Sequence, residues 1–214
     1  MVIIKQTTDF DITGKGDALQ WNSTNWITIP FLMGNGRKND TKAKLLYSAT
    51  GIYCLFSCAD DVLTVTQQQD GLPLWEEDVV ELFLQPDPSQ TNYFEYELSP
   101  MNYELPLIVF NKAGNLNRWV PFQYPDDRRT RHAVTVRGGE ALPGALVQGW
   151  TAEFFVPYPL ISPLMIAPPV AGSKWKGNLY RIDYDYNNEE TLWALYKNSG
   201  NFHEYNNFGF FHFE

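Results

Sequence analysis

Short runs of β-forming residues, each closed by Gly, Pro, Asn or Asp, recur along the chain, and this spacing constrains the fold more than any other feature. Long helical periodicity is nearly absent, and only residues 160–165 are expected to form a short helical turn. Many short apolar segments separated by turn residues are typical of sandwiches and barrels. The segments expected to form strands are 44–49, 52–58, 62–66, 79–84, 93–98, 105–111, 131–136, 150–156, 179–184, 192–196 and 208–213.

This number of strands predicts an all-β fold: a two-sheet antiparallel β-sandwich, immunoglobulin-like or jelly-roll-like, with Greek-key connections. Strand signals of the same kind lie on both sides of the Pro-rich stretch 157–169, and the chain shows no internal repeat. We therefore expect residues 1–214 to form one domain. Cys54 and Cys58 lie four apart in one predicted strand, which is too far for a disulfide between them, so we expect two free, buried thiols.

The charge balance excludes several classes of partner. The formal net charge is -9, and such a surface repels nucleic acid and anionic membranes, whereas neutral ligands and cations remain open. No apolar run approaches the ~20 residues of a membrane span. No signal peptide is visible, which predicts a cytoplasmic protein for the sequence as given, or a secreted or periplasmic one if a leader was removed.

Motifs of common catalytic sites are missing. The sequence has no Gly-x-Ser-x-Gly turn, no Gly-rich phosphate loop and no Cys-x-x-Cys. His132, His203 and His212 are the only histidines, and their spacing does not favour a zinc site. The sequence therefore predicts no catalytic residue of a nucleophilic or zinc-dependent enzyme.

Three acidic residues stand out because they lie in apolar strands. Glu81 interrupts the apolar run 79–84, and Glu95 and Glu97 share one strand face by alternation. A buried carboxylate is costly unless it is paired. One interpretation is a structural ion pair, with Arg181 as the partner; others are hydrogen bonds to sugar hydroxyls or Ca²⁺ coordination. Glycoside hydrolysis by Glu81 with Glu95 or Glu97 also remains open.

Several tryptophans occupy positions that are unusual for a core. Trp75 and Trp175 lie where loops lead into strands, and Trp119 lies in an Asn- and Arg-rich segment expected to be a loop. Such rings could sandwich the apolar face of a sugar ring, although edge packing is an equal alternative. Trp150 and Trp193 lie in the middle of predicted strands, where core packing is expected.

Five segments in a fixed order resemble a known family. They are Lys44-Leu45-Leu46-Tyr47 through Tyr53 with Asp60-Asp61; Trp75-Glu76-Glu77-Asp78-Val79-Val80-Glu81; Tyr93-Phe94-Glu95-Tyr96-Glu97; Gly149-Trp150 to Val156-Pro157; and Trp175 to Arg181, continuing through Trp193 and Phe202-His203 to Phe210. With these segments the chain resembles the carbohydrate-binding module family 9 group of the DOMON-like β-sandwich superfamily. The resemblance covers nearly the whole chain.

The resemblance implies a two-sheet sandwich that binds sugar chain ends in an aromatic slot. By motif position Trp75 matches the first stacking ring and Glu81 a carboxylate that binds sugar hydroxyls, and Trp175 is the candidate for the second ring. Glu95 departs from the family, which can carry a basic residue there. Calcium is often bound in the family, but no ligands can be assigned here. The candidate ligand-binding residues are Trp75, Glu81, Glu95, Glu97, Trp175, Asn178 and Arg181.

The leading functional hypothesis is therefore a non-catalytic module that binds a mono- or oligosaccharide in polysaccharide utilisation, with a glycoside hydrolase or another protein module as a further partner. A glycoside-processing enzyme and a protein-interaction module without a small ligand are the alternatives. Because some DOMON-like domains bind haem, a redox role is also open; its axial ligands would have to be histidine or methionine.

Overall fold

The computed structural model describes residues 1–36, 38–113 and 115–214, and its regular secondary structure is mostly β-strand. One α-helical turn, α1 (Tyr158–Ile161), and a few 3-10 turns complete it. The strands are β1 (Val2–Gln6), β2 (Ile27–Thr28), β3 (Phe31–Gly34), β4 (Thr41–Tyr47), β5 (Gly51–Cys58), β6 (Val79–Gln85), β7 (Tyr93–Leu98), β8 (Glu104–Lys112), β9 (Asn115–Pro121), β10 (Arg131–Arg137), β11 (Gly149–Pro157), β12 (Lys174–Tyr184), β13 (Glu190–Ala194) and β14 (Gly209–Phe213).

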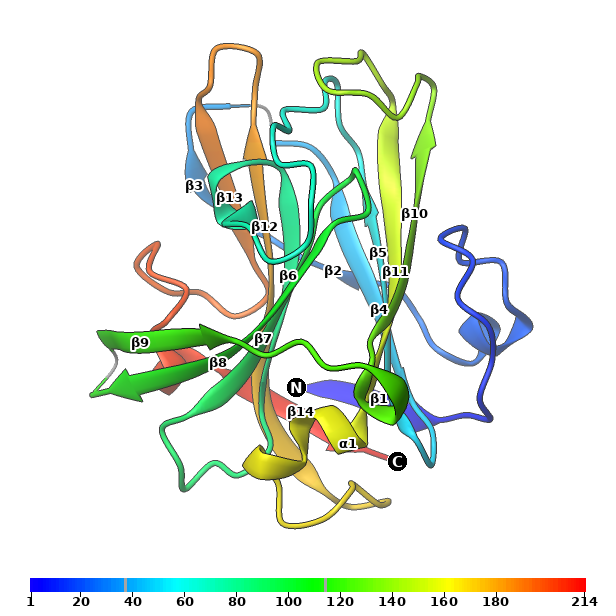
Figure 1. The fold of residues 1–214 in the computed structure, drawn as a ribbon, viewed down its shortest axis with the longest axis vertical. Coiled ribbons are helices and arrows are strands. Elements are labelled where there is room, and N and C mark those ends of the chain that lie inside the picture. The colour runs from blue at the N-terminus through cyan, green and yellow to red at the C-terminus, as the bar shows by residue number, and fades with distance from the viewer. Residues whose placement is uncertain (37, 114) are drawn as a thin grey trace.

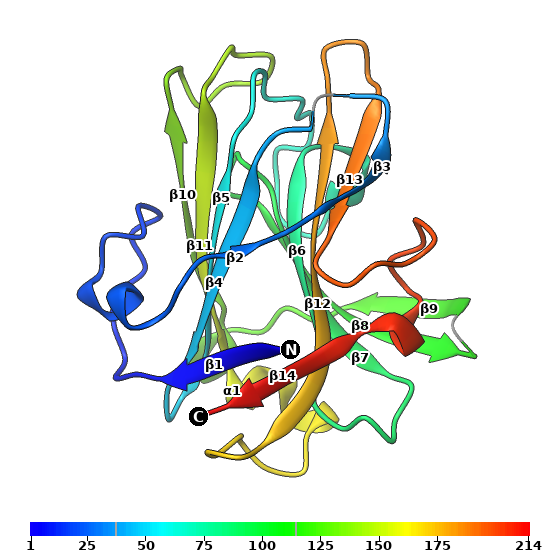
Figure 2. The same cartoon turned by 180° about the vertical axis from the view of Figure 1, so that it is seen from behind.

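Two sheets face each other across the core (Figure 1). The first sheet has the order β10-β11-β5-β4, and the second has the order β14-β12-β6-β7-β8-β9, with β13 beside the later part of β12 and β3 beside β13. The predicted two-sheet β-sandwich is thus confirmed. Two pairings among the described strands are parallel rather than antiparallel, and both involve β1, which pairs with β14 and then with β4. Figure 2 shows β1 beside β14, near both chain ends.

Most predicted strands are present, and the differences have physical causes. Residues 62–66 form no strand, and Val62 makes only an isolated bridge to Leu146. β9 was expected to be a loop: its residues are exposed apart from half-buried Val120, so it shows no apolar alternation. The predicted helical turn at 160–165 begins earlier, with α1 at Tyr158, and continues as a 3-10 turn to Leu164.

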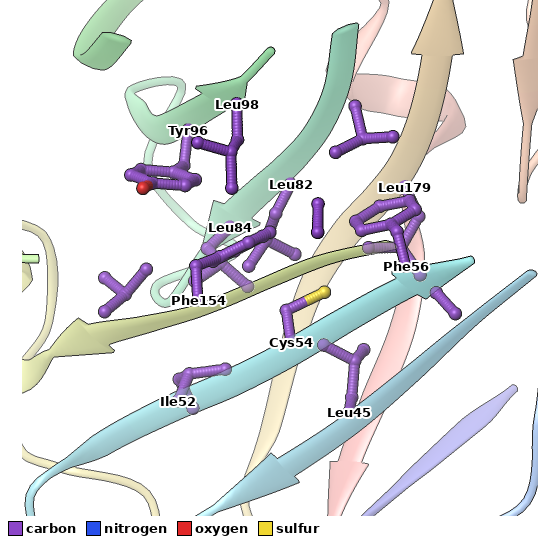
Figure 3. Close-up of a cluster of buried hydrophobic side chains, with 14 of the residues drawn as sticks. Leu45, Ile52, Cys54, Phe56, Leu82, Leu84, Tyr96, Leu98, Phe154 and Leu179 are labelled. Carbon is purple, nitrogen blue, oxygen red and sulfur yellow. The ribbon is translucent and has the colours of Figure 1, made fainter. Parts of the chain in front are cut away.

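The main core lies between the two sheets (Figure 3). In β6 the side chains of Val80, Leu82 and Leu84 belong to this core. Cys54 also lies there, and both cysteines are free and buried, as expected. Because β6 alternates, its other face turns away from the first sheet.

A second apolar cluster covers that outer face of the second sheet. It combines Val79 and Phe83 of β6 with side chains from β7, β8 and β12, and Leu74, Phe202 and Phe208 cover them from loops. Every residue of β6 and β7 is therefore buried, which explains their nearly continuous apolar sequences. Between the covering loops the same face contains a cavity.

No helix in the described ranges is both long and apolar enough to cross a membrane.

Candidate functional site

The cavity on the outer face of the second sheet measures about 330 Å³. Its floor includes Glu81 and Phe83 of β6 and Glu95 of β7. Its walls come from segments far apart in the sequence, namely the 3-10 turn Leu74–Glu76, strand β9 and the loop 200–203. The lining includes Trp75, Glu81, Glu95, Trp119, Glu190 and His203.

Trp75 is held at the cavity by a loop that its acidic neighbours fasten. Gly71 starts this loop with φ +82°, in the left-handed region that suits glycine. After the tryptophan, a carboxylate oxygen of Glu77 accepts backbone N–H bonds from residues 66 and 67, and Asp78 accepts N–H bonds from residues 64 and 184. Two of the acids that follow Trp75 in the family-like motif are therefore structural. They orient the half-buried indole rather than contact a ligand.

Trp119 is the second aromatic side chain of the cavity. Its ring lies edge-on to that of Trp75, with centroids 5.5 Å apart and an interplanar angle of 71°. It projects from the exposed strand β9 and is 38% exposed. Trp119 is not among the residues predicted to bind a ligand, because its segment is expected to be a loop. The sequence of β9 has no periodicity that would assign the ring to a face.

Glu81, Glu95 and Glu97 lie on the cavity side of β6 and β7, as their alternation predicted. Glu81 stands opposite Glu97 in the strand pair, and Glu95 stands opposite Phe83. All three acids are buried. Burial, with repulsion from Glu95, raises the pKa of Glu81 and of Glu97 well above the usual range. Burial also raises the pKa of Glu95 to about 8.

The carboxyl group of Glu95 has one unsatisfied oxygen. Oε2 of Glu95 is buried and has no hydrogen-bond partner among the described residues. The nearest imidazole, that of His203, has its Nδ1 3.9 Å from this oxygen and 2.7 Å from the hydroxyl of Tyr93. Burial lowers the pKa of His203 to about 4, so the ring is neutral at neutral pH and forms no ion pair with Glu95.

Asn178 lies behind the cavity and holds one of its walls. Its Nδ2 donates hydrogen bonds to the carbonyl of Tyr196 and to the hydroxyl of Tyr180. The Tyr180 hydroxyl donates to the carbonyl of Phe202, which lines the cavity. Asn178 is fully buried and does not line the cavity, so the structure makes it a positioning residue for this wall.

Arg181 lies on the opposite face of β12, between the two sheets. It is salt-bridged to Asp60, at 3.1 Å, and to Asp183, and its guanidinium lies 4.9 Å from the ring centre of Trp193. The expected ion pair between Arg181 and Glu81 is therefore wrong. The residue across from Glu81 is Tyr180, and the next residue along the strand necessarily points the other way.

Trp175 also lies on the core face of β12 and is 4% exposed. Its ring packs against Phe213, with centroids 4.9 Å apart, and against Tyr158. The structure thus does not bring Trp175 to the cavity. β12 begins at Lys174, so Trp175 is a strand residue whose alternation places it in the core and not in a loop.

Three aspartates converge between the sheets, where they could in principle hold a calcium ion. One carboxylate oxygen from each of Asp60, Asp78 and Asp183 lies within 4.8 Å of the others. Both oxygens of Asp60 and both of Asp78 already accept N–H bonds, and Arg181 supplies the positive charge. Ca²⁺ takes six to eight oxygen ligands. These residues fit a buried ion-pair network better than a calcium site, and we derive no role for calcium from them.

Comparisons with known proteins bear on the fold of the chain. A family model described as carbohydrate family 9 binding domain-like matches residues 12–106. A family 9 carbohydrate-binding module of Caldicellulosiruptor kristjanssonii, solved with cellotriose, is 16% identical with a TM-score of 0.71, covering 100% of this chain and 93% of the module. A family 9 module from the same organism, solved with glucose, is 18% identical with a TM-score of 0.68 and coverages of 99% and 95%.

A Bacteroides uniformis protein, provisionally described as carbohydrate-binding, is 15% identical with a TM-score of 0.74, covering 100% of this chain and 98% of that one. No curated protein sequence matches the chain. Identities this low show a common fold. The predicted resemblance is confirmed: residues 12–106 match the carbohydrate family 9 binding domain-like model, and the whole chain shares the β-sandwich fold of these solved structures.

Proposed function

We propose that the chain is a non-catalytic module that binds the end of a sugar chain, or a monosaccharide, in the cavity between Trp75 and Trp119. The observation that carries this proposal is the combination of two indole rings with buried carboxyl groups in one cavity. Aromatic rings contact the apolar faces of sugars, and carboxyl groups bind their hydroxyls. The solved relatives in complex with cellotriose and with glucose support the ligand class.

The cavity volume favours a short ligand. About 330 Å³ lies near the lower limit of small-molecule sites. A small polar ligand recovers little buried apolar area, so we expect dissociation constants of roughly micromolar to millimolar. The proposed ligand-binding residues are Trp75, Glu81, Glu95 and Trp119, with Glu97 buried beside the two acids of the floor. We also propose that residues 1–214 act as one module, alone or beside a glycoside hydrolase.

Absence of catalysis is part of the proposal. A glycosidase of the common two-carboxylate type needs one protonated and one ionised carboxyl group, so the two pKa values must lie far apart. Here burial raises the pKa of Glu81, Glu95 and Glu97 alike. No member of the cluster is therefore set up as the ionised nucleophile or base.

The test is tryptophan fluorescence and calorimetry of the whole chain with a panel of neutral mono- and oligosaccharides. Saturable binding that weakens at least about tenfold in Trp75→Ala would support the proposal. Trp26→Ala is the matched control, because Trp26 is 40% exposed and lies outside this cavity. No binding across the panel would refute the proposal and favour a protein-interaction module. Release of reducing ends from the oligosaccharides would favour the enzyme.

A further inference from the structure

The ionisable side chains that line the cavity are acidic, apart from the neutral His203. Glu81 and Glu95 lie on the floor, and Glu190 lies at the exposed rim, where it accepts a hydrogen bond from the hydroxyl of Tyr184. Among the described residues that line the cavity there is no lysine or arginine. Nothing among these lining residues therefore offers a positive charge that could pair with an anionic sugar.

One hydrogen-bond acceptor on the cavity floor also has no donor. Glu95 lines the cavity, and its Oε2 is buried and accepts no hydrogen bond within the described chain. A buried acceptor without a partner costs free energy, and a ligand donor that reaches it recovers that cost. A hydroxyl could donate one such bond. An ammonium group donates up to three and adds charge attraction to the neighbouring carboxyl groups.

The protein's own cations cannot take this role. Arg181 lies on the other face of the sheet and is engaged by Asp60 and Asp183. Lys176 donates to the carbonyl of Tyr205 and lies outside the cavity lining. His203 is neutral at neutral pH. Glu81 and Glu95 therefore form a floor of carboxyl groups that no described side chain pairs with a positive charge, and Glu97 is buried beside them.

We infer that this cavity selects a sugar that carries a free, positively charged amino group, such as a glucosamine residue at a chain end, over the neutral sugar of the same shape. The inference rests on the proposed sugar binding and specifies its ligand class. The indoles of Trp75 and Trp119 would contact the ring, and the ammonium group would donate to Glu95 and its acidic neighbours.

Binding of a cation here has a second consequence that can be measured. The groups that face Glu95 are Glu81, Glu97, Tyr93, Tyr180 and His203. In the empty cavity, burial raises the pKa of Glu95 to about 8, so this carboxyl group is largely protonated at neutral pH. An ammonium group favours the ionised carboxylate, so its binding expels a proton, whereas a neutral sugar leaves the proton in place.

The experiment compares glucosamine, N-acetylglucosamine and glucose by calorimetry on the whole chain, at neutral pH and in buffers of different ionisation enthalpy. The three share one ring: glucose has a hydroxyl where glucosamine has the amino group, and acetylation removes the charge while adding an acetyl group. We expect glucosamine to bind about tenfold more tightly than glucose, because a charge-assisted hydrogen bond is about twice as strong as a neutral one. We also expect its binding heat to depend on the buffer, as proton release requires.

Glu95→Gln is the informative variant, since the amide keeps the shape and removes the charge. We expect the ratio of glucosamine affinity to glucose affinity to fall to about one. Glu140→Gln removes an exposed acid outside the cavity and controls for net charge, so its ratio stays that of the wild type. If Glu95→Gln does not fold, the buffer dependence of the wild type still decides the question.

The possible results separate the two proposals. Glucose that binds as tightly as glucosamine, or glucosamine binding without proton release, would overturn the inference and leave sugar binding intact. Absence of binding by all three sugars and by neutral oligosaccharides would overturn the proposed function as well. A preference that persists in Glu95→Gln would also overturn the assignment of Glu95 as the selecting group.

Discussion

Arg181 provides the sharpest test of how the two faces of β12 are used. Its side chain has no exposed surface and lies between the sheets, where it donates to Asp60 at 3.1 Å, to Asp183 and to the carbonyl of Ala59 at 2.7 Å. These contacts connect the second sheet to the loop that follows β5. Replacement by methionine keeps most of the stem and removes the guanidinium, so Asp60 and Asp183 stay buried without their cation.

Breaking a buried ion pair by removing one partner costs about 3–5 kcal/mol. For a chain of this size that free energy corresponds to a fall in Tm of about 6–20 °C. Arg131→Met is the matched control. Arg131 is exposed, and its guanidinium lies 4.3 Å from the ring centre of Phe155, so its loss should cost less than about 1 kcal/mol.

The loss of stability in Arg181→Met should also depend on pH. Burial raises the pKa of Asp183 to about 6, although the nearby Arg181 opposes this increase. A carboxyl group whose folded pKa exceeds its unfolded value stabilises the fold at low pH, and this contribution is lost as the pH rises through the folded pKa. Without Arg181 the folded pKa rises further, so the penalty at neutral pH grows. The deficit of Arg181→Met should therefore be largest near neutral pH and shrink below about pH 4.

The measurement is thermal and urea unfolding of both variants, followed by circular dichroism at neutral and acidic pH. Equal deficits at the two pH values would refute the electrostatic argument. An Arg181→Met variant with wild-type stability and no sugar binding would refute the placement of this residue, and would restore the direct role in the ligand site that the sequence suggested.

Three further predictions concern other buried polar groups. Burial raises the pKa of Glu95 to about 8, so the stabilising contribution of its protonated form is lost as the pH rises through that value. In alkaline buffer Tm should therefore fall less steeply for Glu95→Gln than for the wild type, and parallel profiles would contradict this. Glu153 accepts bonds from the indole N–H of Trp21 at 2.7 Å and from the N–H of Gly14 at 2.8 Å, so Glu153→Ala should cost about 2–4 kcal/mol in urea unfolding, and a cost below about 1 kcal/mol would disprove the role. Asn178→Ala should lower sugar affinity as well as stability, because it releases the wall around Phe202; unchanged affinity in the folded variant would make Asn178 purely structural.

Alternation predicted the local structure of the best strands and the shared face of the acids. β6, β7 and β11 have nearly the predicted bounds, because every residue in them is buried and apolar runs of that length are strong strand signals. Strands β1, β3 and β9 were not predicted. They are short or exposed, and their pairing partners β14, β13 and β8 supply the stabilisation that their own sequences do not encode.

The aromatic site was predictable only in part. Trp75 belongs to a motif in which glycine, proline and acids fasten a loop, and these are local signals. The second ring was not predictable, since Trp119 reaches Trp75 only because β9 pairs with β8 at the edge of the sheet, next to the second apolar cluster. His203 was considered as a metal or haem ligand, and the structure instead places its ring between Tyr93 and Glu95.

By itself the sequence determined which residues share a strand face, since side chains alternate with a period of two along any strand. That rule places Glu95 with Glu97, and separates Tyr180 from Arg181, in every register. The tertiary structure decided which of the two faces meets the other sheet and which partners lie there. Arg181 turned inward to Asp60, 121 residues away, while Glu81 turned outward to a cavity built by distant loops. Such partners are chosen by the packing of the whole sandwich, because the burial of both apolar faces of the second sheet is a property of the assembled layers and not of any one strand.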